Sequence, residues 1–292
     1  MKTSIIRIPN GRKAEVYMKK QYIIIALLCM ISILSCFSGC VDTSGLPAIT
    51  MNPHAQNDDA SSSSSKAESG KEPAETEPET DPKEQKNMVA ASWFDDAVFV
   101  GDSVTLKLSY YCDEDSENKL SDAKFFCAGS LGYTNALWDL DQEGAVHPYY
   151  QGQNYQSKDC AAVTGASKVF IMLGMNDLSL YGIDESLESA RTLINDILQQ
   201  SPGVTIYIQS VTPIIAGKED EDSNNTLIRK FNGELEIMCD EKGYRYLDVY
   251  NELADKDGYL PLQYCSDPQE QGIHFTDEAC DLWIQYLKEN VS

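Results

Sequence analysis

This chain has few positively charged residues relative to its negatively charged ones. Its 292 residues include 23 lysines and arginines against 46 aspartates and glutamates, which gives a formal net charge of −23. Residues 1–39 hold six basic residues and one acidic residue, so the remainder carries about −28. Nucleic acids and anionic lipid surfaces attract basic patches. The composition therefore argues against a nucleic-acid partner and predicts a well-solvated acidic surface.

Cysteines at metal-binding or redox spacing are missing too. Six cysteines follow residue 88, and none of them belongs to a C-x-x-C motif: Cys112, Cys127, Cys160, Cys239, Cys265 and Cys280. The spacing therefore indicates no zinc or redox site, and the function predicted below needs neither a metal nor an organic cofactor. An even number of thiols outside the cytoplasm permits disulfides in 15 pairings. We predict a bridge between Cys265 and Cys280, and a buried thiol at Cys127, which lies in an apolar run.

A single long apolar run occurs, near the N-terminus. Lys19 and Lys20 precede "YIIIALLCMISILSCFSGC", which has the layout of a secretory signal peptide. Its end, "FSGC", resembles a bacterial lipobox, so we predict a lipoprotein signal peptide over residues 1–39 and lipidation of Cys40. Cys36 ends a rival cleavage site, and Met18 is an alternative start. The competing interpretation is a permanent membrane span, which normally needs about 20 apolar residues.

Residues 40–88 contain hardly any apolar side chains. Stretches such as "SSSSSKAESGKEPAETEPETDPKEQK" are rich in Ser, Glu, Pro and Lys. Such a segment cannot bury enough surface to offset the entropy lost on ordering. We predict an acidic, flexible tether that holds a folded domain, residues 89–292, at the extracytoplasmic face of the cell membrane through the lipid anchor.

From residue 89 onward, short apolar runs alternate with longer amphipathic segments. The expected strands are 98–100, 124–127, 168–173, 204–209 and 244–249, and the expected helices are 104–111, 133–140, 187–200, 225–241 and 277–290. Strands separated by helices favour crossover connections and a mostly parallel sheet that is covered on both faces. We predict an α/β fold, in which ligands bind beyond the carboxyl ends of the strands.

A serine stands where the first expected strand turns into a helix. Ser103 follows Gly101 and Asp102, and the main-chain N–H groups at a helix start are free to receive negative charge. A serine in this place can attack a carbonyl carbon while nearby amides accept the developing oxyanion. The alternative is that Ser103 serves only as a helix N-cap.

Histidine, the usual base for such a serine, is scarce. The chain has three: His54 in the predicted tether, His147 before a proline in a loop, and His274 just before the last expected helix. Neither of the first two follows a strand, whereas the loop that carries His274 can fold over the edge of the sheet. Elimination therefore favours His274 as the base.

Two further segments supply candidate donors for an oxyanion. Gly174 permits a sharp turn after the third expected strand, and Asn176 then projects an amide towards the same edge. The competing interpretation of Asn176 is a turn asparagine. In "FFCAGSLGYTNA", Gly132 places a main-chain N–H in a loop after the second strand, with Gly129 as its rival.

Taken in order, these motifs resemble the SGNH (GDSL-type) hydrolases over residues 95–290. The matching pieces are Gly101-Asp102-Ser103, a loop glycine, Gly174-x-Asn176-Asp177 and Gly272-Ile273-His274. The resemblance implies a three-layer α/β/α sandwich of flavodoxin-like type, with a mostly parallel five-stranded sheet. It also implies ester hydrolysis, with Ser103 as nucleophile, His274 as base, and an oxyanion hole formed by the amides of Ser103, Gly132 and Asn176.

One position departs from the family pattern. The family usually has an aspartate three residues before the histidine, and this chain has Gln271 there. Gln271 or a main-chain carbonyl can accept the imidazole N–H, or a carboxylate can come from Asp267, Glu270 or Asp277. The third outcome is weak hydrolysis, since a neutral replacement costs about 10⁴ in turnover in a serine protease.

The predicted function is that of a serine esterase that works through an acyl-enzyme on Ser103. The substrate is expected to be an acylated carbohydrate or another small ester, and O-acetyl groups on envelope or extracellular carbohydrate come first because of the predicted location. The alternatives are an O-acyltransferase that uses the same acyl-enzyme, and a non-catalytic lipoprotein that binds a glycan or a lipid.

Overall fold

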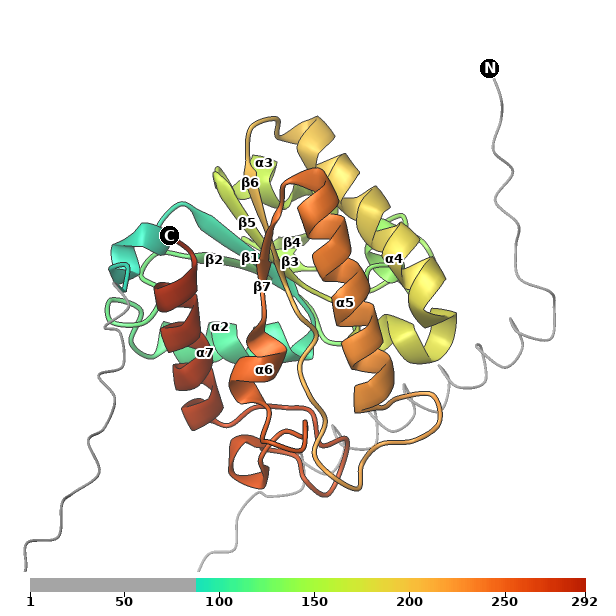
Figure 1. Cartoon of the computed structure of the whole chain (residues 1–292). Helices are drawn as coiled ribbons and strands as arrows, with labels where there is room; N and C mark the ends of the chain where they lie inside the picture. Colours follow the sequence, from blue (N-terminus) through green and yellow to red (C-terminus); the bar gives the residue numbers. More distant parts are fainter. Residues whose placement is uncertain (1–87) are drawn as a thin grey trace, which may run out of the picture. The chain divides into compact units, whose positions relative to one another are not determined.

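The computed structural model describes residues 88–292 (Figure 1). The predicted signal peptide, Cys40, His54 and almost all of the predicted tether lie outside the described residues. Within residues 88–292, no helix combines the length and the apolar character needed to cross a membrane.

Five parallel strands form the central sheet, in the order β2-β1-β5-β6-β7. They are β1 (Ala97–Gly101), β2 (Lys124–Cys127), β5 (Lys168–Met172), β6 (Thr205–Gln209) and β7 (Arg245–Leu247). After β1 the chain builds β2 on one side, and it later adds β5, β6 and β7 on the other. The direction of winding therefore reverses between β1 and β5, as in flavodoxin-like folds, and ligands bind at such a switch point.

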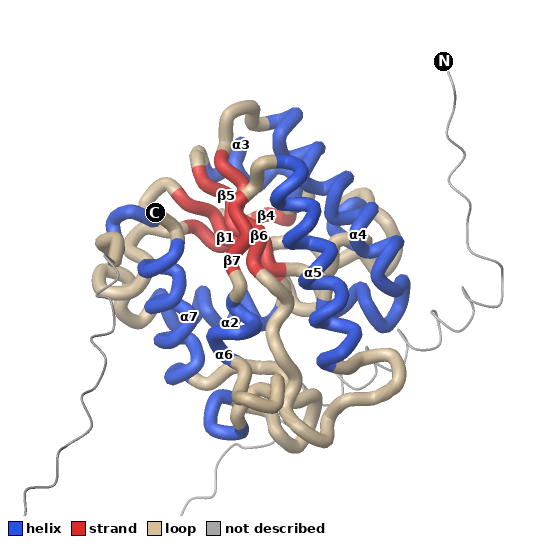
Figure 2. The backbone as a smooth tube through the Cα atoms, viewed as in Figure 1, coloured by secondary structure: helices blue, strands red, loops and turns tan. Residues whose placement is uncertain are grey.

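Helices cover both faces of this sheet (Figures 1 and 2). One layer holds α2 (Ser103–Asp113), α6 (Val249–Leu253) and α7 (Asp277–Asn290), and the other holds α3 (Cys160–Thr164), α4 (Met175–Gln200) and α5 (Asn225–Lys242). Successive residues of a strand point to opposite faces of the sheet. In β1, Val98 and Val100 pack with the second layer of helices, and Phe99 packs with the first. The prediction of a three-layer α/β/α sandwich is confirmed.

A stack of aromatic rings crosses the sheet beneath the first layer. Phe99, Phe170 and Tyr207 are register partners on β1, β5 and β6. Their ring centroids lie 4.6 and 4.4 Å apart, and the rings are nearly parallel. Each ring is buried. This stack holds the strand register on which the positions of the strand ends depend.

The expected strands and most expected helices occur close to their predicted bounds, with three differences. The strand expected over 244–249 ends at Leu247, and Val249 instead begins α6. The prediction of a helix over 133–140 is wrong, because only a short 3-10 helix, η3 (Asn135–Leu137), forms there. The main-chain N–H groups of Tyr133 and Thr134 instead donate to the Asp177 carboxylate. The helix expected over 187–200 begins earlier, at Met175, and is interrupted at Gly182, where the backbone leaves helical geometry.

A small hairpin stands apart from the main sheet, and no pattern in the sequence indicated it. It pairs β3 (Tyr149–Tyr150) with β4 (Gln153–Asn154) in antiparallel fashion and lies beside the edge strand β2. Phe126 of β2 packs against Tyr150 of the hairpin, with ring centroids 5.5 Å apart. The hairpin thus adds a wall to the open edge of the sheet.

All six cysteines of the described residues are free thiols. The predicted Cys265–Cys280 bridge is therefore wrong. The Cys265 thiol donates a hydrogen bond to the Asp267 carboxylate, whereas Cys280 is a buried residue of α7 in the first layer. Cys127 is a thiol as expected, although it is half-buried rather than fully buried.

Candidate active site

Ser103 is the first residue of α2, at the point where β1 ends. Asp102 caps the helix, since its carboxylate accepts the Val104 N–H at 2.9 Å. The alternative role of Ser103 as the N-cap is therefore excluded. Because the neighbouring carboxylate already caps the helix, the Ser103 hydroxyl is directed to another partner, which lies 171 residues further along the chain.

That partner is His274. The Nε2 atom of His274 lies 2.9 Å from the Ser103 hydroxyl oxygen, and Nδ1 lies 2.7 Å from the Asp267 carboxylate. An ionised carboxylate only accepts hydrogen bonds, so Nδ1 carries the proton and Nε2 accepts the Ser103 hydroxyl hydrogen. The three side chains form the chain of hydrogen bonds that activates a serine in acyl-transfer enzymes.

Asp267 supplies the carboxylate that the family motif has at position 271, where this chain has Gln271. Gln271 and Glu270 are exposed, and Asp277 pairs with Lys107 of α2. Of the alternatives drawn from the sequence, the structure thus selects Asp267, seven residues before the histidine. The family spacing is three, so the chain between the two side chains is longer here.

This longer connection folds back on itself to bring Asp267 to the ring. The Asp267 carbonyl accepts the N–H groups of Glu270 and Gly272, and its carboxylate accepts those of Ile273 and His274 at 3.1 and 3.0 Å. The main chain of His274 therefore helps to hold the Asp267 carboxylate, and that carboxylate in turn orients the His274 ring. A single side chain both closes the loop and sets the tautomer of the imidazole.

The environment keeps Asp267 ionised. Burial by itself raises the pKa of this carboxyl, but the hydrogen bonds from the His274 side chain and main chain, with that from Cys265, hold its pKa below the usual range. Its side chain is 12% exposed, so water screens the attraction to an imidazolium only weakly. Asp267 is suited to stabilise positive charge on His274.

The pKa of the Asp102 carboxyl shifts in the opposite direction, upwards. Burial of its side chain raises the pKa to about 6, although the Val104 N–H and the proximity of His274 favour the charged form. Asp102 also accepts a long hydrogen bond, 3.4 Å, from the Asn176 amide. This carboxyl thus connects the nucleophile's helix to the start of α4.

The two candidate oxyanion donors outside α2 are both occupied within the protein. The Asn176 amide donates to the Leu131 carbonyl at 3.0 Å, and the Gly132 N–H donates to the side-chain oxygen of Asn135 at 2.7 Å. The Leu131 carbonyl and the Gly132 N–H belong to one trans peptide, so they point in opposite directions. In this structure the Gly132 N–H therefore faces away from Asn176.

Asp177 fixes the loop that carries Gly132. Its buried carboxylate accepts the N–H groups of Tyr133 and Thr134 at 2.8 and 2.9 Å. A Cβ atom added at Gly132 would lie 2.5 Å from this carboxylate, whereas one added at Gly129 would meet nothing within 4 Å. Of the two rival glycines, Gly132 is thus the one at which the fold requires glycine.

Gly174 makes the predicted turn after β5. Its φ of +129° lies in a region that L side chains rarely adopt, and an added Cβ would meet the Phe231 ring at 2.5 Å. This turn starts α4 with Asn176 in its first turn, beside the end of β1. The structure therefore brings together all four motifs that the sequence singled out.

Asn135 was missed in the sequence, although its spacing offered a signal. It stands three residues after Gly132, and its side chain accepts the Gly132 N–H in the manner of a capping box.

His147, excluded as a base, lies outside the hydrogen-bond chain, and its Nε2 contacts the Asp139 carbonyl at 3.2 Å. Within residues 88–292, no three His, Cys, Asp or Glu side chains gather as ligands for a metal.

Comparison with known proteins gives one family and several solved structures. The model of the GDSL-like lipase/acylhydrolase family matches residues 99–282, which is more than half of the chain. No curated protein matches the chain.

Two solved structures share the fold. A protein of Streptococcus pneumonia, provisionally described as a platelet activating factor, is 20% identical with a TM-score of 0.51, over 66% of this chain and 82% of that one. A GDSL-like lipase of Bacteroides thetaiotaomicron is 15% identical with a TM-score of 0.50, over 66% of this chain and 86% of that one. At these identities the likeness establishes the fold alone.

Proposed function

Because this chain belongs to the GDSL-like lipase/acylhydrolase family of ester-hydrolysing enzymes, we propose that it cleaves esters with Ser103, His274 and Asp267. The observation that carries the proposal is the unbroken series of hydrogen bonds, 2.9 Å from Ser103 to His274 and 2.7 Å from His274 to Asp267. A serine, a base and a carboxylate in this order are the parts needed for nucleophilic catalysis.

The first half of the reaction forms an acyl-enzyme. The Ser103 oxygen attacks the ester carbonyl carbon as its proton passes to Nε2 of His274. The carbon–oxygen bond to the alcohol then breaks, and His274 returns the proton to the departing alkoxide. Asp267, ionised and hydrogen-bonded to Nδ1, stabilises the imidazolium between these two proton transfers.

The second half uses water. His274 accepts a proton from a water molecule, whose oxygen attacks the acyl carbon on Ser103, and the carboxylic acid leaves as the serine recovers its proton. An acyltransferase would run this half-reaction with a sugar hydroxyl in place of water. The two reactions share every protein group, so the acceptor that reaches the acyl-enzyme decides between them.

The oxyanion is accepted by the Ser103 N–H, which is free at the start of α2, and by the Asn176 amide. The Gly132 N–H joins them when the peptide between Leu131 and Gly132 rotates. This rotation breaks the Asn176–Leu131 and Gly132–Asn135 hydrogen bonds, each worth about 1 kcal/mol. Glycine at position 132 permits the change of φ that the rotation requires.

O-acetyl groups on envelope or extracellular carbohydrate are the proposed substrates. The support is the predicted lipoprotein signal with Cys40 as the lipidated residue, which would place the domain at the extracytoplasmic face of the membrane, among surface glycans. A non-catalytic glycan- or lipid-binding lipoprotein remains the alternative from a different class. It does not account for the Ser103–His274–Asp267 geometry.

Hydrolysis of p-nitrophenyl acetate by the full chain tests the proposal, with Ser103→Ala as the comparison. We expect turnover by the wild type, labelling by a fluorophosphonate probe, and loss of both in Ser103→Ala. Equal activity in the two proteins would overturn the role of Ser103, and inactivity of both would favour the binding protein. Transfer of acetyl to an added oligosaccharide, measured against release of acetate, separates the transferase from the hydrolase.

A further inference from the structure

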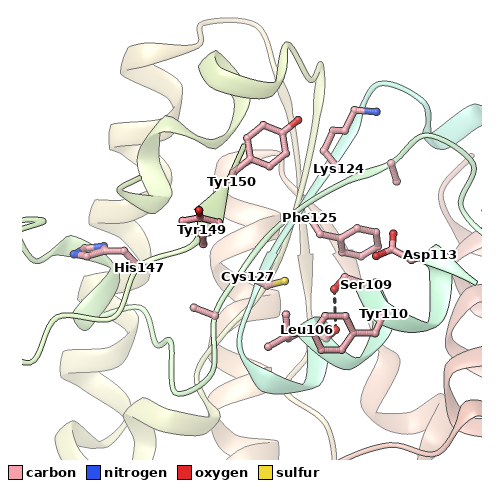
Figure 3. Close-up of a pocket in the computed structure, with 12 residues that line it drawn as sticks. Leu106, Ser109, Tyr110, Asp113, Lys124, Phe125, Cys127, His147, Tyr149 and Tyr150 are labelled. Carbon is pink, nitrogen blue, oxygen red and sulfur yellow. Dashed lines mark hydrogen bonds between the residues drawn. The ribbon is translucent and has the colours of Figure 1, made fainter. Parts of the chain in front are cut away.

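A pocket of about 540 Å³ lies between α2, the edge strand β2 and the β3–β4 hairpin (Figure 3). Its walls include Leu106 and Tyr110 of α2, Phe125 and Cys127 of β2, and Tyr149 and Tyr150 of β3. The hydrogen bonds proposed for catalysis use none of these six side chains. The pocket exists because the hairpin stands beside an otherwise open edge of the sheet.

The pocket lies along α2, the helix that Ser103 begins, although Ser103 itself does not line it. Ser103, Leu106 and Tyr110 are spaced i, i+3 and i+7, so they lie along one side of α2, and the first two are about one helical turn apart. On the strand side, Ala128 also lines the pocket, and its N–H donates to the Gly101 carbonyl at 3.1 Å. Leu106 and Ala128 therefore mark the end of the pocket that is nearer to Ser103.

Aromatic surface is left uncovered at the mouth of the pocket. Tyr110 is 61% exposed and Tyr149 is 68% exposed, although both side chains are large. Figure 3 shows them on opposite walls, one from α2 and one from the hairpin. Exposed aromatic rings that flank a cavity offer flat apolar faces with a polar hydroxyl at the rim, as ligand sites do.

The pocket also carries polar groups, which distinguishes it from a channel for a hydrocarbon chain. Asp113, Lys124 and His147 line it together with the tyrosines. The Nδ1 atom of His147 is buried without a hydrogen-bond partner among the described residues. In Figure 3 the His147 ring points away from the other labelled side chains, so Asp113 and Lys124 are the charged groups that a ligand in the pocket would meet.

We propose that this pocket holds the pyranose rings of an acylated glycan, with the ester group placed at Ser103. The flat C–H faces of a sugar ring match the tyrosine rings, and its hydroxyls match the charged and polar rim. A long acyl chain would place hydrocarbon against Asp113 and Lys124, which is unfavourable. The proposal rests on the proposed esterase function and adds a reason, from the described residues themselves, for a carbohydrate substrate.

Binding and turnover of the full chain test this pocket. The variants are Tyr110→Ala and Tyr149→Ala, and the matched control is Ile237→Ala, which removes a 52% exposed side chain from α5 on the other layer. For each protein, kcat/KM on O-acetylated xylo-oligosaccharide and on O-acetylated chito-oligosaccharide is divided by kcat/KM on p-nitrophenyl acetate. We expect at least one of these ratios to fall about tenfold or more in the tyrosine variants, through KM, and to stay within twofold in the control.

A second measurement does not depend on turnover. Titration of the deacetylated oligosaccharides into Ser103→Ala should give binding heat, and adding Tyr149→Ala should abolish it. The proposal is overturned if the tyrosine variants lower neither ratio, or if they lower instead the ratio for p-nitrophenyl octanoate, which would assign the pocket to an acyl chain. If the wild type does not cleave p-nitrophenyl acetate, the esterase function fails, and the titration alone then decides whether the pocket binds sugar.

Discussion

The Asp267 carboxylate lies 2.7 Å from Nδ1 of His274, across a loop of six residues that its own main chain and side chain hold closed. The family motif usually has its aspartate three residues before the histidine, where this chain has Gln271. The role of the missing aspartate is thus filled from a position four residues earlier, because the intervening segment folds back rather than extending.

Replacement of Asp267 by asparagine should lower kcat on p-nitrophenyl acetate by about 10³- to 10⁴-fold, as the loss of the equivalent carboxylate does in a serine protease. The amide no longer stabilises the imidazolium and no longer fixes the tautomer. Gln271→Ala is the matched control, and we expect it to stay within about twofold, since Gln271 is exposed. A larger effect of Gln271→Ala than of Asp267→Asn would contradict the assignment.

Alanine at the two rival glycines should behave very differently. Gly132→Ala forces a methyl group to 2.5 Å from the Asp177 carboxylate, so we expect a loss of about 1–3 kcal/mol in the free energy of unfolding and a marked loss of activity. Gly129→Ala places its methyl group in open space and should change the unfolding free energy by less than about 0.5 kcal/mol. Urea unfolding of both variants measures the difference, and similar losses would disprove it.

Asn135 should control how easily the Gly132 N–H becomes available. Asn135→Ala removes the acceptor that holds this N–H at 2.7 Å, so we expect kcat to rise by up to about fivefold, the equivalent of one hydrogen bond. Asn135→Asp keeps the acceptor and adds charge, which should lower kcat. Steady-state kinetics on p-nitrophenyl acetate distinguish the two. A fall in both variants, with unfolding free energies within 1 kcal/mol of wild type, would mean that the Gly132 N–H does not serve the oxyanion.

Asp102 should make stability depend on pH between about 4 and 6. Its pKa is raised from 3.8 to about 6 by burial, so the folded protein holds this proton over a range in which the unfolded chain has released it. The free energy of unfolding then falls as pH rises through this window, by up to about 3 kcal/mol from this group. Above pH 6 the contribution is constant.

Asp102→Asn removes that titration while it keeps an oxygen that can accept the Val104 N–H. The variant's stability advantage over wild type should therefore grow by up to about 3 kcal/mol between pH 4 and pH 7. Urea titrations at each pH give both curves. Parallel curves for the two proteins would show that Asp102 is not the group that titrates.

The order of elements and the place of the site followed from local patterns. Runs such as 124–127 and 277–290 report burial and helical periodicity within a few neighbouring residues, so their bounds are readable in isolation. Since parallel strands share one carboxyl edge, the residues that follow β1 and β5, among them Ser103 and Asn176, were expected at the same edge of the sheet once these strands were recognised. The rarity of histidine then pointed to His274.

Other features depended on contacts that no local pattern encodes. The segment at 133–140 is weakly helical by itself, but its N–H groups bind Asp177, which lies about 44 residues away in the chain, so tertiary hydrogen bonds replaced a helix. Cys265 and Cys280 lie on either side of His274 in sequence, yet the Cys265 thiol bonds to Asp267 whereas Cys280 is buried in α7. The β3–β4 hairpin, two residues per strand, is too short to give a periodic signal.

The sequence by itself determined the α/β architecture and singled out Ser103 and His274, the proposed nucleophile and base, because burial periodicity and residue type are properties of short segments. Only the tertiary structure decided that Asp267 orients His274, that Asn135 holds the Gly132 N–H, and that tyrosines of α2 and β3 face one pocket. These relationships depend on atoms meeting within about 3 Å after loops have closed, and hydrogen bonds of that length are set by the whole packing rather than by spacing along the chain.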